Sequence, residues 1–254
     1  MNGLLSKLGF SKEAVRPAPP SSWRDENEPR IVYHVRPRAR RISLKMDAAR
    51  REIVVAVPGS AKKLESARRF AREKYDWIQV QLETLPPAQP FCHNGQILFR
   101  GELYQLLSTS TRGHPSYDEN TRTINVPAPE GTLEGRTKRF LIRQARETLT
   151  ARTHVHAQML GKPVSKVSVR DTSSRWGSCV TRRGEGQISY SWRLICAPPF
   201  VLDYVAAHEC AHLVEANHGA NFWNLCDELV ETVKPAKRWL NQNGALLHAV
   251  GAHH

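Results

Sequence analysis

Two histidines and a glutamate in the segment His208-Glu209-Cys210-Ala211-His212 are the residues best suited to chemistry. In a helix, a rotation of about 100° per residue places His212 about 40° around from His208 and one turn along, so both imidazoles can bind one metal ion. Glu209 lies about 100° to the side, where it can touch a metal-bound water without being a ligand. Cys210 lies on the face opposite His208, so we assign it to the core.

A third ligand has to come from beyond this helix, and His218 is the first candidate. It stands between Asn217 and Gly219, where we expect the helix to break and the chain to fold back over the metal. Three imidazoles and a water make the open arrangement of catalytic zinc, so we predict one Zn²⁺ per chain, with other divalent transition metals as chemical substitutes. Three downstream carboxylates could instead accept hydrogen bonds from the imidazoles or replace His218: Asp227, Glu228 and Glu231.

The chemistry that these residues predict is hydrolysis. Zinc lowers the pKa of a bound water toward about 7 and polarises the carbonyl or phosphoryl oxygen that it meets. Glu209 would take the proton from that water as a general base and pass it to the leaving group. Peptide-bond hydrolysis is the reaction that this spacing most often serves, so we expect a metal-dependent hydrolase with a peptide or protein substrate.

The composition describes a strongly basic chain. Its 254 residues carry 37 Lys and Arg against 24 Asp and Glu, a formal net charge of +13, and 40% of them are hydrophobic. The positive charge is concentrated between Arg30 and Arg51 and again between Arg136 and Arg152. Such segments attract nucleic acid or nucleotides, but solvated faces that keep a protein soluble explain them equally well.

The sequence also argues against several classes of protein. No segment approaches the roughly 18 consecutive apolar residues of a transmembrane helix, and the N-terminus lacks the pattern of a secretory signal. The five cysteines are an odd number, widely spread, which argues against a disulfide framework. We therefore expect a cytoplasmic protein that does not associate with membranes, and the sequence leaves its oligomeric state open.

Hydrophobic periodicity predicts three parts and an α+β fold. Residues 1–29 are expected to be a disordered leader, residues 30–130 a β-rich region with one helix, and residues 131–254 the catalytic region. The β-rich region should form one sheet from RISLKM, EIVVAV, the hairpin GQILFRGELYQLL and RTINVPAP, with a helix over 61–85. The catalytic region should contain a helix over 132–161, the strands VSKVSV and QISYSWRLI, and a helix opened by Pro198-Pro199.

Longer segments resemble a known family. RWGSC, ISYSWRLICAPP and HECAHLVEANHGANFW, together with VRPRARRISLKM, REKYDWIQVQL and GQILFRGELYQL, resemble the bacterial YgjP-like family of predicted zinc metallopeptidases. The likeness spans residues 31–242, and its most specific block is the histidine segment that ends in FW. More distantly the chain is similar to the SprT-like and WLM proteases, some of which cut proteins crosslinked to DNA, but it shows no appended DNA-binding module.

The resemblance implies a zincin-like metallopeptidase domain with an N-terminal β-rich portion. It matches His208, His212 and His218 to the metal ligands and Glu209 to the general base. A nucleoside-triphosphate pyrophosphatase activity is also attached to the family, which makes a nucleotide hydrolase a rival function. Against that rival, phosphate chemistry usually recruits magnesium through carboxylates, whereas three histidines select zinc-like ions. A nucleic-acid-associated protein with a structural metal is a third hypothesis.

Weaker signals concern the substrate. Zincin-like folds place an edge strand before the active-site helix, so Gln187–Ile195 is either that strand, pairing with an extended peptide, or an internal strand. Arg175, Tyr190 and Arg193 are candidates for stabilising a developing oxyanion or binding a phosphate. In the RWGSC segment, the tryptophan is expected to pack and the glycine to form a tight turn.

Overall fold

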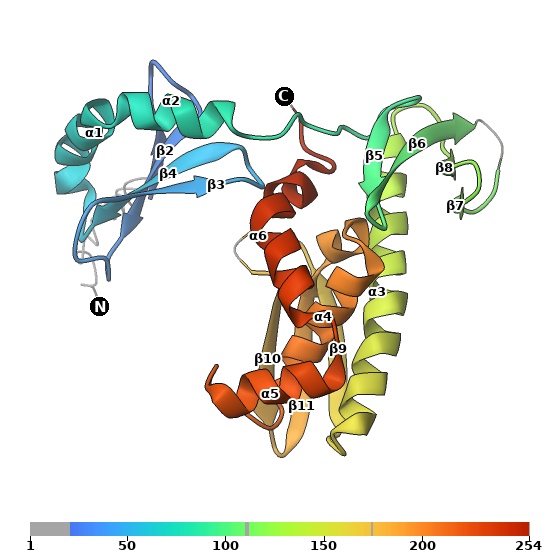
Figure 1. The fold of residues 1–254 in the computed structure, drawn as a ribbon. Helices are drawn as coiled ribbons and strands as arrows, with labels where there is room; N and C mark the ends of the chain where they lie inside the picture. The colour runs from blue at the N-terminus through green and yellow to red at the C-terminus, as the bar shows by residue number, and fades with distance from the viewer. Residues whose placement is uncertain (1–20, 110–111, 174, 254) are drawn as a thin grey trace, which may run out of the picture. The chain divides into compact units, whose positions relative to one another are not determined.

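The computed structural model describes residues 21–109, 112–173 and 175–253, which form three small sheets and six α-helices (Figure 1). This confirms the predicted α+β class. The chain divides into two compact units. The described residues up to Lys45 join Ile53–Tyr75 in the first unit, and Met46–Glu52 joins the described residues from Asp76 onward in the second.

The first sheet has the order β1-β2-β4-β3. Its strands are β1 (Ser22–Arg24), β2 (Ile31–Arg36), β3 (Ser43–Asp47) and β4 (Glu52–Pro58). Strand β4 alternates as the sequence predicts, because Ile53, Val55 and Val57 are fully buried. The expected leader lies outside the described residues as far as residue 20. In its remaining part, strand β1 pairs with β2.

The predicted helix over residues 61–85 is divided in the structure. A 3₁₀ turn (Ala61–Lys63) leads into α1 (Leu64–Glu73), and α2 (Tyr75–Glu83) follows after Lys74. The buried positions recur at the helical spacing from which the helix was predicted: Ala67, Ala71, Ile78 and Leu82. The periodicity therefore identified the buried face correctly but missed the break between α1 and α2, because no glycine or proline marks it.

The second sheet is separate from the first, so the expectation of one N-terminal sheet is wrong. It has the order β5-β6-β8-β7, from β5 (Gln96–Phe99), β6 (Glu102–Thr109), β7 (Ser116–Asp118) and β8 (Thr123–Pro127). The predicted hairpin turns at Arg100-Gly101, where both residues have positive φ angles. Backbone hydrogen bonds join this turn to the carbonyls of Ile195 and Cys196, so the hairpin holds the segment that precedes the histidine helix.

The long helix α3 (Leu133–Met159) matches the helix predicted over 132–161 and lies along the third sheet and helix α4 (Figure 1). The third sheet has the order β10-β11-β9, from β9 (Val164–Arg170), β10 (Gly177–Arg182) and β11 (Glu185–Ser191). Strands β10 and β11 form a hairpin with positive φ angles at Arg183 and Gly184, and β11 pairs in parallel with β9. The expected strand over 187–195 ends at Ser191, because Trp192–Cys196 forms a 3₁₀ turn.

Helix α4 (Pro199–Ala211) begins with proline in its first turn, as predicted, and is followed by α5 (Ala220–Leu229) and α6 (Val233–Ala249). Asp203 ties it to α3 because the carboxylate accepts two hydrogen bonds from Arg152, at 2.6 and 2.9 Å, and one from His156 at 2.6 Å. Cys210 is fully buried, which confirms its assignment to the core. These contacts fix the helix that carries the histidine motif.

Two further expectations can be compared with the described residues. All five cysteines are free thiols, in agreement with the predicted absence of a disulfide framework. Of the helices that the structure describes, none has the length and apolar character needed to cross a membrane.

Candidate metal and active site

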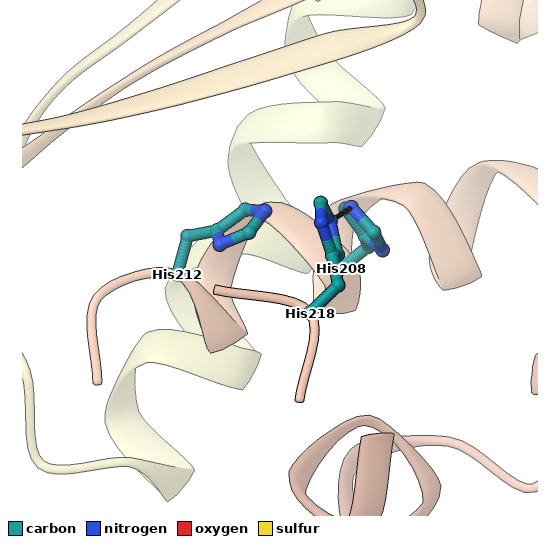
Figure 2. Close-up of side chains that lie close together, drawn as sticks. All are labelled: His208, His212 and His218. Atoms are coloured by element: carbon teal, nitrogen blue, oxygen red, sulfur yellow. Dashed lines mark hydrogen bonds between the residues drawn. The ribbon is translucent and has the colours of Figure 1, made fainter. Parts of the chain in front are cut away.

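Helix α4 and the loop after it present the three predicted metal ligands. His208 lies in the last turn of α4, His212 caps that helix, and His218 is exposed in the loop before α5. Figure 2 shows the three imidazoles gathered together, with His208 and His218 in direct contact. Their ligand atoms all lie within 4.8 Å of one another. The structure therefore brings together all three histidines.

The geometry of these nitrogens fits a metal ion. The Nε2 atoms of His208 and His218 are 3.2 Å apart, and two nitrogens bound at about 2.0–2.1 Å to one tetrahedral zinc would be about 3.3 Å apart. Burial, followed by the neighbouring His212 and His218, lowers the pKa of His208 to about 4. Burial also lowers the pKa of His212. Neutral imidazoles offer the lone pairs that a transition metal requires, so the residues fit such an ion.

The hydrogen bonds that orient the imidazoles do not come from the predicted carboxylates. The Nδ1 atom of His212 lies 3.0 Å from the main-chain carbonyl of Glu215, and Nδ1 of His208 lies 3.4 Å from the hydroxyl of Tyr204. The first contact leaves Nε2 of His212 for the metal. The three carboxylates considered for this role are exposed and lie outside the ligand cluster: Asp227, Glu228 and Glu231.

Glu209 is buried beside the three histidines. Only 5% of its surface is exposed, and burial raises its pKa to about 7, with Arg175 opposing the shift. A carboxyl group with a pKa near neutrality is suited to taking up and releasing a proton. The side chain lines a cavity together with the three histidines.

Gly177 has a different role from the predicted tight turn. It is the first residue of β10, and its φ angle is not positive. A Cβ atom at this position would lie 2.6 Å from Cγ of Glu209, closer than real Cβ contacts allow. The glycine therefore lets the strand approach the carboxylate, a close-packing requirement rather than a turn requirement.

A cavity of about 580 Å³ lies between strand β10 and the histidine helix. Gly177, Ser178, Cys179 and Thr181 line it from the strand. Strand β10 is at the edge of its sheet and β11 is in the centre. Residues 187–191 therefore form an internal strand, which was one of the two alternatives for this segment. The edge strand beside the cavity is β10, which is not among the strands predicted from the sequence.

The structure does not bring the weaker substrate candidates to this cavity. Tyr190 is 1% exposed, and its hydroxyl lies 2.9 Å from that of Thr153. Arg193 is buried against the ring of Trp192 and pairs with Asp171. Tyr190 and Arg175 instead line a second pocket, on the other face of the sheet.

An aromatic residue that the sequence reasoning missed packs against the three histidines. The Phe222 ring is fully buried, and its centroid lies 4.9, 4.6 and 4.7 Å from those of His208, His212 and His218. Trp223 stacks beside His218 at 5.7 Å. The FW pair after the last histidine was the available signal, but periodicity alone does not distinguish such a support from ordinary core.

A nucleophilic thiol is not favoured at this site. Cys179 lines the cavity, but burial, with the nearby Glu209 adding to it, raises the pKa of the thiol to about 11. The thiol is therefore protonated at neutral pH, whereas only the thiolate form is a strong nucleophile. The arrangement favours a reaction in which water is the nucleophile and Glu209 handles the proton.

An α+β fold with a helical HExxH motif and a third histidine defines the class of metallopeptidase-like domains. The comparison with known families agrees, because the YgjP-like metallopeptidase domain matches residues 40–243, well over half of the chain. The chain therefore belongs to the YgjP-like family, and the resemblance seen in the sequence is confirmed. Neither the curated proteins nor the solved structures include a significant match.

Proposed function

We propose that this chain is a zinc-dependent peptidase that hydrolyses peptide bonds in the cavity between β10 and α4. The observation that carries the proposal is the convergence of three histidines and the buried Glu209 on one cavity. His208, His212 and His218 would hold one zinc ion per chain, with other divalent transition metals as substitutes. Family membership supports a peptide substrate.

The chain's own residues would handle the proton and the orientation. When bound, zinc supplies a Lewis acid that polarises a carbonyl oxygen and acidifies water. Glu209 accepts the proton of the attacking water and delivers it to the departing amine nitrogen. Gly177 keeps the strand backbone against this carboxylate and so limits where its oxygen atoms can lie.

Strand β10 supplies a way to hold an extended substrate. Its second edge has no neighbouring strand within the described part of the chain, and four of its residues line the cavity. Main-chain groups of a peptide could pair with this edge, which would lay the scissile bond beside the histidines. Arg175, Tyr190 and Arg193 do not line this cavity, so no contact with the peptide is assigned to them.

The cavity favours a peptide over the two rival functions. None of the described residues that line it is Lys or Arg, although a nucleoside triphosphate would need cationic side chains there. The described His/Cys/Asp/Glu groups supply three ligands, which leaves a coordination position for water, in contrast to a closed structural site. Nucleotide hydrolysis and a structural metal therefore rank below peptide hydrolysis.

The test is a mass-spectrometric product survey. Zinc-loaded wild type, Glu209→Gln and the exposed control Glu228→Gln would receive a peptide and protein pool with the four nucleoside triphosphates. We expect new peptide termini from wild type and the control and none from Glu209→Gln, with the bound zinc unchanged in all three. If nucleoside monophosphate and pyrophosphate were the products, the site would be assigned to nucleotide hydrolysis instead.

We also propose that the protein is cytoplasmic.

A further inference from the structure

The β10-β11-β9 sheet has a polar outer face that the proposed peptidase site does not use. Residues alternate between the faces, so Cys179, Ile188 and Val167 face the core while their sequence neighbours face the other way. On the outer face Ser178, Ser189 and Ser168 stand side by side in register. A pocket of about 260 Å³ lies on this face.

Positive charge dominates this outer face. Lys166, Arg170, Arg175 and Arg182 all line the pocket and are all exposed, while the described residues that line it include no Asp or Glu. None of the four cations forms an ion pair with another described residue. Asp171, adjacent in sequence to Arg170, is engaged by Lys138 and Arg193. The four side chains are therefore unpaired among the described residues, although Arg175 is also near enough to Glu209 to lower the pKa of that carboxyl group.

A buried hydroxyl at the same pocket also lacks a partner. Ser191 is fully buried and lines the pocket, and its Oγ finds no hydrogen-bond partner among the described residues. A buried polar group without a partner is uncommon in folded proteins and calls for an explanation. A ligand oxygen that accepts a hydrogen bond from the Ser191 hydroxyl would satisfy this group. If the ligand is negatively charged, it could also form ion pairs with the arginines.

The chemistry of the face favours phosphate groups on a chain. Phosphate oxygens in nucleic-acid complexes are bound chiefly by Arg, Lys and side-chain hydroxyl groups, which are the groups gathered here. Interfaces with nucleic acid are also more polar and more positively charged than those with protein, whose buried centres are apolar and aromatic. The pocket is smaller than the roughly 300–1,000 Å³ of sites that enclose a small ligand, so it suits a strand lying across it.

We propose that the outer face of the β10-β11-β9 sheet binds the phosphate backbone of single-stranded nucleic acid. The net charge of +13 would assist the encounter. Gly177 and Ser178 line both this pocket and the cavity of the histidines, so only strand β10 separates the two sites. Nucleic acid held on one side of β10 would place an associated protein close to the other. The binding claim itself is independent of the peptidase proposal.

The test measures the binding of full-length protein to labelled single-stranded DNA and RNA of about 12 nucleotides by fluorescence anisotropy. The salt concentration would be varied between about 50 and 200 mM. Each phosphate neutralised on a single strand contributes about −0.7 to the slope of log affinity against log salt, so four cations predict a slope of about −3. The double variant Arg170→Gln/Arg182→Gln should weaken binding at low salt and bring the slope to about −1.4.

The matched control removes the same charge elsewhere. Arg146→Gln/Arg238→Gln changes two exposed arginines outside this pocket, and it should keep the wild-type slope and affinity. Thermal melting would show that both double variants are folded. Equal weakening of binding by the two double variants would overturn the proposal, because it would show that binding depends only on the overall charge of the protein. Equally tight binding of an acidic peptide or a single nucleoside triphosphate would also overturn it, because the ligand would then be another polyanion.

Discussion

The backbone of Gly177 lies directly against the carboxylate of Glu209, with room for no side chain between them. The two residues are far apart in the sequence, and they meet because the edge strand β10 and helix α4 form opposite walls of one cavity. The strand that we expect to hold the substrate therefore also restrains the group that we expect to move the proton.

Substituting Gly177 should impair catalysis more than folding. In Gly177→Ala the new methyl group would overlap Glu209 and displace its carboxylate, and a misplacement of about 1 Å can cost roughly 100-fold in rate. We expect kcat for peptide cleavage to fall by about that factor while the bound zinc, measured by mass spectrometry, is unchanged. Gly135→Ala is the control, because its Cβ meets only the flexible end of Arg139, and wild-type kcat is expected there. Wild-type kcat in Gly177→Ala would contradict the assignment.

The support that Phe222 gives to the histidines can be tested by truncation. Phe222→Ala removes a fully buried ring that contacts all three imidazoles, so the free energy of unfolding should fall by about 3–5 kcal/mol and zinc should bind more weakly. Urea titration and a zinc-binding titration would measure the two effects. The control Val233→Ala truncates another buried side chain, which should lower stability and leave zinc affinity intact. Unchanged zinc affinity in folded Phe222→Ala would refute this role.

The ion pair between α3 and α4 predicts a dependence of stability on pH. Burial raises the pKa of Asp203, but hydrogen bonds from His156 and Arg152 outweigh it, so the net pKa lies below its ordinary value of 3.8. A lowered folded-state pKa stabilises the fold above about pH 4, and this stabilisation is lost as the pH falls through the folded-state value.

Asp203→Asn should therefore lower the free energy of unfolding by about 1–3 kcal/mol near neutral pH, and the difference from wild type should shrink as the pH falls below 4. Denaturant titrations at several pH values measure it. Asp227→Asn, at an exposed carboxylate on α5, should have no comparable effect. A difference that does not change with pH would show that the Asp203 carboxylate acts through packing alone.

The turn at Gly101 should be intolerant of any side chain. Its φ angle is +87°, and a Cβ atom would lie 2.9 Å from Cα of Pro198 at the start of the histidine helix. Gly184 has a similar φ of +81° with nothing within 4 Å of the equivalent position, so Gly184→Ala incurs only the backbone cost of about 1–2 kcal/mol. We expect Gly101→Ala to have a clearly lower Tm than Gly184→Ala. Equal Tm values would show that the approach to Pro198 is unimportant.

Local patterns in the sequence predicted the parts that depend on local geometry. The positions of His208, Glu209 and His212 follow from helical rotation alone, and the hairpin at Arg100-Gly101 follows from its turn residues. His218 was chosen by residue type and spacing, and the structure places it within 4.8 Å of the other two histidines, measured between the ligand atoms.

The same reasoning could not predict how segments distant in the sequence pair and pack. Whether β10 or β11 forms the edge depends on the parallel pairing of β11 with β9, which no strand signal encodes. The separation of the N-terminal strands into two sheets has the same origin, since each strand pattern reports only a buried face. The contact of Gly177 with Glu209 likewise depends on how strand and helix pack.

The most direct test of the central claim follows bound metal and peptide cleavage in one titration. Metal-free protein would receive increasing zinc, with bound metal measured by elemental mass spectrometry and cleavage measured on a peptide found in the product survey. We predict that bound zinc and cleavage rise together and saturate at one ion per chain, and that His208→Ala abolishes both. Full cleavage by metal-free protein, or one bound zinc per chain without cleavage of any peptide, would contradict the account.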